Sequence, residues 1–259
     1  MAHRSISQLN SLSDCGERYR LERTVPGLPV RPAAWTVVGT AAHTAYEVWE
    51  KTDRVMDLSE LFFQHYTEEI AVQQTRQPDA KLWVKTPNVK TVERDIDLRL
   101  EHGVKQMRAL QEHCEQSEWR VAEIGGKKAI EVPLEVTFGD VLVLGHVDVV
   151  LEWPDGKLSA RDWKTGHKKG TKNRQLGFYK LGLNEKYGLD IRFGDFFFTK
   201  LGDSGGYVDL SRYTRDYLHD QFTKLNRIIE EGLYLANPGE HCDLCTVKFW
   251  CREMGTPPK

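Results

Sequence analysis

Two acidic residues and a lysine lie at spacings that would place them on one face of a β-hairpin. Pro154-Asp-Gly156 separates two apolar-rich runs and predicts a type I turn closed by a glycine in the left-handed conformation. Trp153 then faces Lys157, and the same antiparallel register pairs Asp148 with Asp162, with Cβ atoms about 5 Å apart. Because side chains alternate along a strand, Lys164 shares the face of Asp162.

Two carboxylates this close repel each other unless a cation lies between them, and oxygen ligands of this kind suit Mg²⁺ or Mn²⁺. Such an ion would activate a water and neutralise charge on a phosphate, while Lys164 would orient the nucleophile or stabilise the transition state. Trp163 points to the other face, which leaves its backbone carbonyl near the acids. The alternative is a solvated hairpin with an ordinary cross-strand Asp–Lys pair.

The hairpin resembles the PD-(D/E)xK nuclease signature, in the RecB-like branch whose first acid follows a glycine. Gly39-Thr-Ala-Ala-His43 resembles the Gly-x-x-x-His motif of that branch. Gln175-Leu-Gly-Phe-Tyr179 resembles its Gln-x-x-x-Tyr motif, and this spacing puts both side chains on one face of a helix. The resemblance implies the following metal ligands: His43, Asp148, Asp162 and the carbonyl of Trp163. It implies these catalytic residues: Asp148, Asp162, Lys164, Gln175 and Tyr179.

Two further acids are candidates with plain alternatives. Glu131 stands where related sequences often carry another acid, although Glu135 is close by. Glu47 lies one helical turn after His43, but it could simply pair with Lys51 at i,i+4.

The cysteines provide a second, independent signal. Three of them form C-x2-C-x5-C near the C terminus, and a fourth lies near the N terminus: Cys242, Cys245, Cys251 and Cys15. No secretory signal or membrane-spanning run is present, so we expect an intracellular protein with reduced thiols that bind metal. Four thiolates fit either Zn²⁺ or a 4Fe–4S cluster, and bond chemistry leaves both open. His241 is a possible substitute ligand, and Cys114 is expected to be an ordinary buried thiol.

The cysteine pattern resembles the iron–sulfur motif of RecB-like exonucleases, found in AddB-type nucleases and in exonucleases of phages and CRISPR adaptation modules. The resemblance implies a 4Fe–4S cluster that ties the first helix to the last segment, with Zn²⁺ as the alternative occupant.

A basic loop follows the hairpin. Its cations are predicted to contact DNA: Lys168, Lys169, Lys172 and Arg174. A solvated loop is the alternative. The net charge of −2 argues against a protein that coats nucleic acid by charge alone. Trp35 and Phe178 are candidates for stacking on bases.

The pattern of elements predicts an α/β protein. Helices are expected at 5–20, 39–51, 59–76, 91–117, 174–187 and 213–231, and strands at 129–138, 141–153, 157–165 and 191–200. A stretch with Pro78 and Pro87 is expected to be an exposed loop or lid. The order implies a restriction-endonuclease-like core, with a central mixed sheet flanked by helices. We expect one nuclease domain over 1–259, comprising a helical part (1–120), a catalytic αβ core (121–210) and a cluster-bound C-terminal segment (211–259).

The residues predict a metal-dependent nuclease, and the resemblance to iron–sulfur relatives implies a DNA exonuclease that attacks single-stranded ends, with 5′ to 3′ polarity favoured. Recombination, repair and CRISPR adaptation are the expected settings, in a bacterial or phage-infected cell. The chain lacks a P-loop, so a helicase partner would supply any unwinding. The competing hypothesis is a non-catalytic iron–sulfur module that holds DNA ends or assembles with a partner.

Overall fold

The computed structural model describes residues 3–166 and 172–255. The α-helices are α1 (Ile6–Asp14), α2 (Gly16–Arg23), α3 (Ala34–Lys51), α4 (Leu58–Arg76), α5 (Val92–Gln116), α6 (Arg174–Tyr187) and α7 (Arg215–Glu231), with short 3-10 helices η1 (Ala80–Leu82), η2 (Glu240–Leu244) and η3 (Lys248–Trp250). The strands are β1 (Arg120–Val121), β2 (Glu123–Ile124), β3 (Lys127–Lys128), β4 (Ile130–Phe138), β5 (Val141–Glu152), β6 (Leu158–Lys164), β7 (Phe193–Phe198), β8 (Asp203–Ser204) and β9 (Val208–Asp209).

Polar caps and glycines delimit the helices. Thr91 accepts a hydrogen bond from the Arg94 N–H at the start of α5, and Asp57 does the same for the Glu60 N–H at the start of α4. Gly188 ends α6 with φ +69°, a left-handed conformation that glycine adopts without strain. These local signals are the reason that the predicted helices lie close to their observed positions.

The central sheet is mixed. β5 pairs antiparallel with β4 and β1 on one edge and with β6 on the other. β6 pairs parallel with β7, whose other edge carries β8 and β9. The parallel pair is possible because α6 forms the crossover between β6 and β7.

The predicted hairpin register is confirmed. Val149 pairs with Arg161 and the pairing continues to the end of β5. At the turn, the Trp153 N–H donates to the Lys157 carbonyl at 2.9 Å, and Gly156 has φ +79°.

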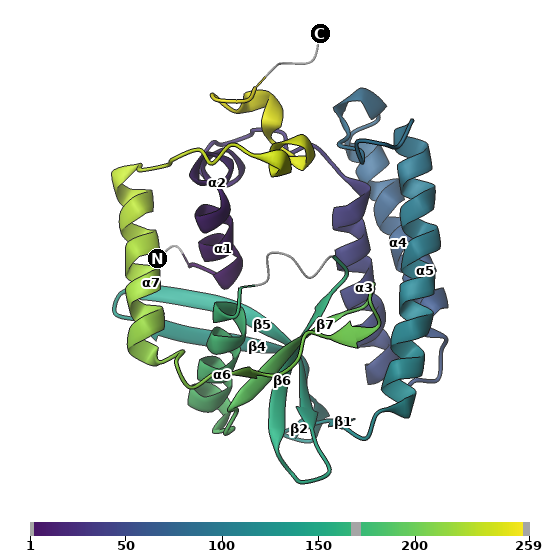
Figure 1. Cartoon of the computed structure of the whole chain (residues 1–259), viewed down its shortest axis with the longest axis vertical. Coiled ribbons are helices and arrows are strands. Elements are labelled where there is room, and N and C mark those ends of the chain that lie inside the picture. Colours follow the sequence, from purple (N-terminus) through teal and green to yellow (C-terminus); the bar gives the residue numbers. More distant parts are fainter. Residues whose placement is uncertain (1–2, 167–171, 256–259) are drawn as a thin grey trace.

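Helices cover both faces of the sheet (Figure 1). On one face α1, α6 and α7 enclose a core that includes Phe178 and Phe222. On the other face α3, α4 and α5 enclose a second core that includes Trp49 and Trp163. This layered arrangement is the mixed α/β architecture expected of a restriction-endonuclease-like fold.

The two cores meet in the middle of β5. Val147 packs in the first core, whereas Val149, two residues further along, packs in the second. Regular alternation would send both side chains to one face, so the strand turns at Asp148. On the neighbouring strand Glu131 has φ +48°, which is rare for a residue with a Cβ. Both acids therefore lie where the sheet changes the direction of its side chains.

The first predicted helix is wrong as a single element. The chain breaks at Cys15, which is extended with φ −162° and ψ 113°, and α2 then starts in a new direction. A Cβ on Gly16 would lie 2.7 Å from the Leu235 backbone, and the Glu17 N–H donates to the Leu235 carbonyl at 3.2 Å. The break thus docks α2 against the C-terminal segment, a long-range contact that helical periodicity does not report.

Two other predicted boundaries also differ. α3 begins at Ala34 rather than at Gly39, because apolar residues before the glycine continue its buried face. The stretch between α4 and α5 is not a free loop, since Trp83 and Val84 are buried and Val84 bridges to Ala33.

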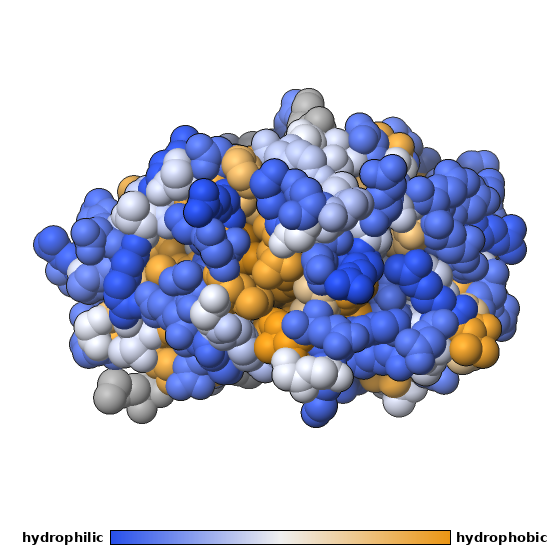
Figure 2. Space-filling model, turned by 90° about the horizontal axis from the view of Figure 1, so that it is seen from below, coloured by the Kyte–Doolittle hydropathy of each residue, from blue (hydrophilic) through white to orange (hydrophobic). Residues whose placement is uncertain are grey.

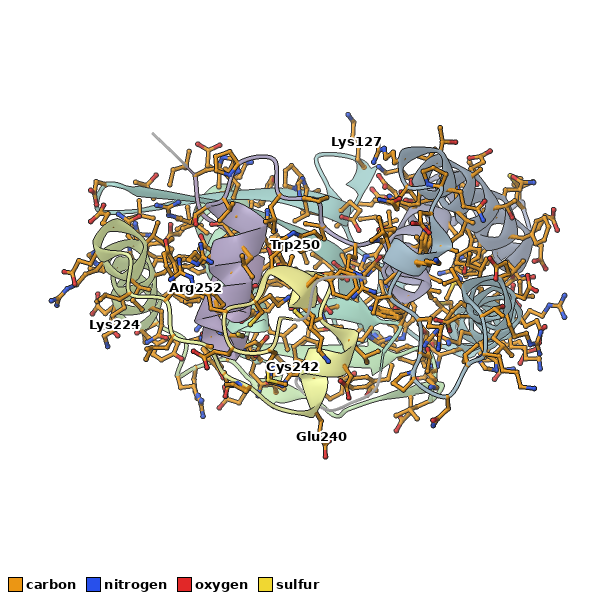
Figure 3. All side chains as sticks on the ribbon, turned by 90° about the horizontal axis from the view of Figure 1, so that it is seen from above. Lys127, Lys224, Glu240, Cys242, Trp250 and Arg252 are labelled. Carbon is orange, nitrogen blue, oxygen red and sulfur yellow. The ribbon has the colours of Figure 1, made fainter. Side chains whose placement is uncertain are left out.

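The C-terminal segment, with Cys242 and Trp250, crosses the top of the molecule over α2 and lies between α7 and the pair α4 and α5 (Figure 3). None of the helices in the described ranges is long and apolar enough to cross a membrane.

Candidate functional site

His43 lies where α3 meets the strands. Its Nε2 is 3.2 Å from the Trp163 carbonyl oxygen, and its Nδ1 is 3.3 Å from Glu131 Oε1 and 3.5 Å from Asp148 Oδ2. Burial lowers the pKa of His43, but the negative charges of Asp148, Glu131 and Asp162 outweigh burial and raise it to about 9. Without an ion, the imidazolium is the cation among these carboxylates.

Asp148 is buried beside a second acid. Burial, followed by the charge of Asp162, raises the pKa of Asp148 well above its ordinary value, while His43 opposes the shift. The backbone N–H of Trp163 donates to Asp148 Oδ2 at 2.8 Å, which orients the carboxyl group. A cation at this position would relieve the repulsion between the two acids.

Asp162, on β6, is held by α6 and by its own strand. Gln175 Nε2 donates to Asp162 Oδ1 at 2.6 Å, and the Tyr179 hydroxyl donates to the same oxygen at 2.9 Å. Lys164 Nζ donates to Gln175 Oε1 at 3.2 Å and lies 2.5 Å from Asp162 Oδ2. The structure therefore brings together Asp162, Lys164, Gln175 and Tyr179, on the shared faces that their spacing predicts.

Two details of this network bear on metal binding. Burial, reinforced by the charges of Asp148 and Asp162, raises the pKa of Tyr179 well above 10, so its hydroxyl remains a donor. Asp162 Oδ2 is buried and, although Lys164 Nζ is close, the contact lacks hydrogen-bond geometry, so this oxygen accepts no hydrogen bond. Asp162 Oδ2 therefore already faces a cation, the Lys164 ammonium, and a metal ion at this oxygen would replace that contact.

Among the described residues, the group with metal-ligand spacing is His43, Glu131 and Asp148, whose donor atoms lie within 4.8 Å of one another. Glu131 thus joins the site, and its left-handed backbone is the kind of strain found at functional positions. Asp162 lies outside this group and borders it through Tyr179, whose hydroxyl is also 3.4 Å from Asp148 Oδ1. The donor set of one imidazole and several carboxylates fits Mg²⁺ or Mn²⁺.

Phe178 is fully buried in the first core, so the prediction that it stacks on bases is wrong. Its ring packs against Gly145, where an added Cβ would lie 2.8 Å from Phe178 Cε1. The glycine before the first acid therefore allows α6 to approach β5 closely, and this approach brings Tyr179 within reach of Asp148. Trp35 is partly exposed, and its predicted stacking role stays a prediction.

One element of the site was not found from the sequence. Arg161 forms a buried, two-point ion pair with Asp195 on β7, with distances of 2.8 and 2.7 Å. His113 Nε2 lies 3.4 Å from Arg161 Nη1; burial and then the Arg161 charge lower the pKa of His113, so its neutral ring can accept. The pair joins β6 to β7 directly beside Asp162. In the sequence, Arg161-Asp-Trp-Lys164 looks like a polar surface strand. The ion pair with Asp195 becomes visible only when β7 lies beside β6.

The remaining polar candidates have intramolecular partners. Glu47 pairs with Lys51 at 2.5 Å, as its plain alternative proposed. Lys172 contacts Asp14 and donates to the Asn10 carbonyl, and Arg174 donates to Asn10 Oδ1 at 2.6 Å. Both basic residues thus attach α6 to α1, and their contact with DNA stays a prediction. Lys168 and Lys169 lie outside the described residues.

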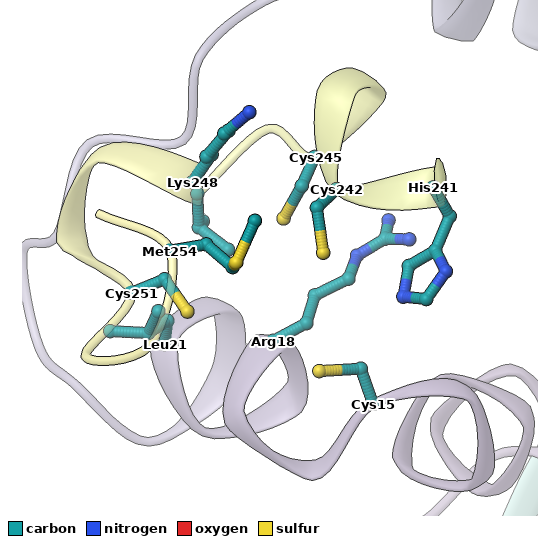
Figure 4. A pocket seen from close by; sticks show the side chains of 10 residues that line it. Cys15, Arg18, Leu21, His241, Cys242, Cys245, Lys248, Cys251 and Met254 are labelled. Atoms are coloured by element: carbon teal, nitrogen blue, oxygen red, sulfur yellow. The ribbon is translucent and has the colours of Figure 1, made fainter. Parts of the chain in front are cut away.

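The four predicted cluster ligands line one small cavity of about 20 Å³ (Figure 4). Cys15 comes from the break between α1 and α2, and the other three come from η2, η3 and their caps. All four are free thiols, and burial raises the pKa of the Cys245 thiol. The Arg18 side chain extends between Cys15 and Cys242, and it pairs with Glu22 at 2.8 Å. His241 also lines the cavity.

Cys114 lies apart from this cavity. It is buried in the second core, and burial raises its pKa to about 12, so it is an inert thiol, as expected.

A larger hollow of about 470 Å³ opens on the lower face of the molecule, where apolar side chains gather (Figure 2). It is lined by the β5–β6 hairpin with Phe193 and Tyr207, and it includes none of the predicted site residues.

Comparisons with known proteins agree with this geometry. A family model described as the PD-(D/E)XK nuclease superfamily matches residues 3–252. The Gene 69 protein of Mycobacterium phage D29 is 31% identical over 264 residues, covering 96% of this chain and 96% of that protein. The Gene 69 protein of Mycobacterium phage L5 is 30% identical over 281 residues, covering 96% of this chain and 95% of that protein.

Proposed function

Because the chain belongs to the PD-(D/E)XK nuclease superfamily, we propose that it is a Mg²⁺- or Mn²⁺-dependent DNA exonuclease. Superfamily membership implies a nucleic-acid substrate and suggests metal-dependent hydrolysis. The observation that carries the proposal is the convergence of His43, Glu131 and Asp148, with Asp162 and Lys164 paired beside them.

The proposed metal ligands are Asp148 and Asp162, with His43, Glu131 and the Trp163 carbonyl completing the set. A divalent ion bound there supplies charge neutralisation at the phosphate and lowers the pKa of water. His43 must lose its proton to serve as a ligand, so binding of the ion releases a proton.

The other residues act by position and charge. Lys164, partly exposed beside Asp162, can orient the attacking water or stabilise charge on the phosphate oxygens. Gln175 holds Lys164 and Asp162 in register through its amide, and Tyr179 fixes the Asp162 carboxylate by donating to it. Such outer contacts set the orientation of metal-binding groups.

We further propose that the four cysteines hold a 4Fe–4S cluster. Thiolates arranged tetrahedrally at about 2.3 Å from zinc would lie roughly 3.8 Å apart. The four cysteines line one cavity, and the resemblance to the RecB-like iron–sulfur exonucleases is what supports the cluster over zinc. The Arg18 side chain extends between Cys15 and Cys242, so it would have to move aside for a cluster.

Iron–sulfur nucleases of the RecB-like branch commonly act on single-stranded ends, so 5′ to 3′ degradation of single strands is the proposed activity. The similarity to phage proteins supports action inside an infected bacterial cell. Recombination, repair and CRISPR adaptation are the roles proposed there, from the resemblance to the RecB-like branch. A helicase partner would supply the single strand.

The test is degradation of single-stranded and duplex DNA labelled at the 5′ or the 3′ end, using protein purified without oxygen, with Mg²⁺, Mn²⁺ or EDTA. We expect metal-dependent cutting that falls at least about 10²-fold in Asp162→Asn. The matched control is Asp155→Asn, which removes an exposed acid of the same hairpin that pairs only with Lys157.

Three outcomes are distinguishable. Cutting that survives Asp162→Asn would remove Asp162 from the mechanism. Stable binding of DNA ends without cutting by the intact protein would favour the non-catalytic module. Zinc without iron in the oxygen-free preparation would replace the cluster by a zinc scaffold.

A further inference from the structure

A basic pocket lies at the far end of α3 from the metal site. Its volume is about 410 Å³, between the α4–α5 connection and the C-terminal segment. Its charged lining residues are Arg31, Lys81, Lys85, Lys90, Glu93 and Asp243. The whole chain carries a net charge of −2, so four cations in one concavity are a local exception.

The acids of the pocket are already engaged, whereas two of its cations are not. Asp243 pairs with Lys248 at 2.8 Å, and Glu93 forms a hydrogen bond with Thr91. Lys81 and Lys90 are exposed, and within the described ranges neither ammonium group has a hydrogen bond or an ion pair. Their positive charge is therefore available to an anionic ligand.

The pocket wall belongs to the connection between α4 and α5, and several contacts hold its backbone in place. Arg31 donates to the Leu82 carbonyl at 3.0 Å and to the Trp83 carbonyl at 2.9 Å, and its guanidinium lies 3.8 Å from the Phe249 ring centroid. Lys85 Nζ donates to the Val89 carbonyl at 2.7 Å. These contacts hold the backbone that carries Lys81 and Lys90.

α3 connects the pocket to the metal site. The bridge between Ala33 and Val84 joins the start of α3 to the pocket wall, and His43 follows Ala34 by nine residues, or about 14 Å of helix. Thr36, Thr40 and His43 lie at i, i+4 and i+7 on one face, and both threonines are exposed. A small, polar and open face thus runs from the basic pocket to the metal site.

We propose that the phosphodiester backbone of a single DNA strand lies along this face of α3 and is held at its far end by Lys81 and Lys90. This inference rests on the proposed nuclease function, because it assigns the path of the same substrate. At the roughly 3.4 Å per phosphate of a stacked strand, a span of about 14 Å covers at most about four phosphates, and an extended strand would place fewer there. A DNA strand long enough to reach both the metal site and the basic pocket gains electrostatic affinity that a shorter DNA strand lacks.

The test compares Lys81→Glu/Lys90→Glu with Lys105→Glu/Lys127→Glu. The control changes the net charge equally at two exposed lysines, on α5 and β3, that also have no partner within the described residues. Binding of a labelled 16-nucleotide oligothymidylate is measured by anisotropy against salt in buffer without divalent metal. Loss of two contacts should reduce the salt slope by about 1.4 and the affinity at 0.1 M salt by roughly 25-fold.

Hydrolysis of bis(4-nitrophenyl) phosphate, a small phosphodiester, should be equal in both variants, because it does not reach the pocket. Equal salt slopes in the two variants would overturn the inference. Displacement of the oligonucleotide by polyglutamate of equal charge would also overturn it, because the pocket would then suit acidic protein. If no DNA is cut but the slope still falls, the proposed nuclease function fails while the binding path stands.

Discussion

The two candidate metal-binding regions of this protein are built in different ways. The acidic site stands on β4, β5, β6 and α3, and its side chains already have partners in the absence of an ion. The cysteine cavity is formed by a helix break and short 3-10 turns, and backbone N–H groups make weak hydrogen bonds to two of its sulfurs, for example from Asn237 to Cys15 Sγ at 3.4 Å. The first site is preorganised by the fold, whereas the second must obtain its geometry from what it binds.

The difference has a physical cause. Carboxylates and imidazole accept or donate hydrogen bonds, so a network can hold them before metal arrives. Thiols are weak hydrogen-bonding groups, and burial keeps Cys245 protonated until a metal replaces its proton. Metal binding at the cysteines is therefore coupled to the order of the C-terminal segment.

Replacing Cys245 by Ser should have the largest effect. Loss of the cluster removes a link between α2 and the C-terminal segment, and a cross-link of this kind contributes about 3–5 kcal/mol, or about 10 °C in Tm. Visible absorption measures the loss of the cluster, and thermal unfolding measures the loss of stability. Cys114→Ala is the control, and it should keep its visible absorption. Chelation of Mg²⁺ should change Tm by only a few degrees. A larger loss of Tm on Mg²⁺ chelation than on Cys245→Ser would reverse the comparison.

Tyr179→Phe should lower DNA cleavage about 10- to 100-fold without changing Tm by more than a few degrees. It removes the hydroxyl that orients Asp162 but keeps the ring in the first core. Mg²⁺ titration of cleavage rates tests this. The control is Tyr187→Phe, at a partly buried tyrosine at the end of α6 whose hydroxyl donates to the Pro133 carbonyl. Wild-type rates in Tyr179→Phe would show that the strands alone orient the acid.

The stability of the ion-free protein should fall as pH rises from 6.5 to 9. The pKa of His43 is raised to about 9, so its contribution is fully present below pH 6.5 and is lost as pH rises through 9. Because Mg²⁺ requires the deprotonated ring, its stabilising effect should grow over the same range. Tm with and without Mg²⁺ should differ by a few degrees at pH 9. In His43→Gln the fall in stability should be smaller, because only the raised pKa of Asp148 would still contribute to it. An unchanged fall would assign it to groups other than His43.

Arg18→Gln should have the smallest effect. Arg18 is the cation that extends into the cysteine cavity, so its charge favours thiolates and a negatively charged cluster. Without it, loss of the visible absorption under a chelator should be a few-fold faster, with cleavage of DNA by the loaded protein unchanged. Arg23→Gln, at the end of the same helix, is the control. Equal rates would mean that the sulfurs alone set the stability of the cluster.

The parts of the site that the sequence predicts are those governed by short-range geometry. The turn at Pro154–Gly156 suffices to set the hairpin register as far as Val149 and Arg161, next to the two acids, and the alternation of side chains places Lys164 beside Asp162. Helical spacing likewise puts Gln175 and Tyr179 on one face. These rules depend on a few neighbouring residues, so they hold independently of how the rest of the chain packs.

Contacts between elements that are distant in the sequence could not be predicted from turn geometry or residue spacing. The left-handed conformation of Glu131 has no glycine to signal it, the buried pair of Arg161 with Asp195 requires the parallel neighbour β7, and the break at Cys15 depends on Leu235. Phe178 was predicted to stack on bases because the sequence does not show that its ring is buried in the first core.

The sequence by itself determined the family, the hairpin with its acids and the set of cysteines, because local conformational preferences and ligand chemistry are written into residue types and spacings. Only the tertiary structure decided that Glu131 joins His43 and Asp148, that Lys172 and Arg174 attach to α1, and that a basic pocket lies about half the length of α3 from His43. Those outcomes depend on how helices and strands pack, and packing brings together residues that no short-range pattern relates.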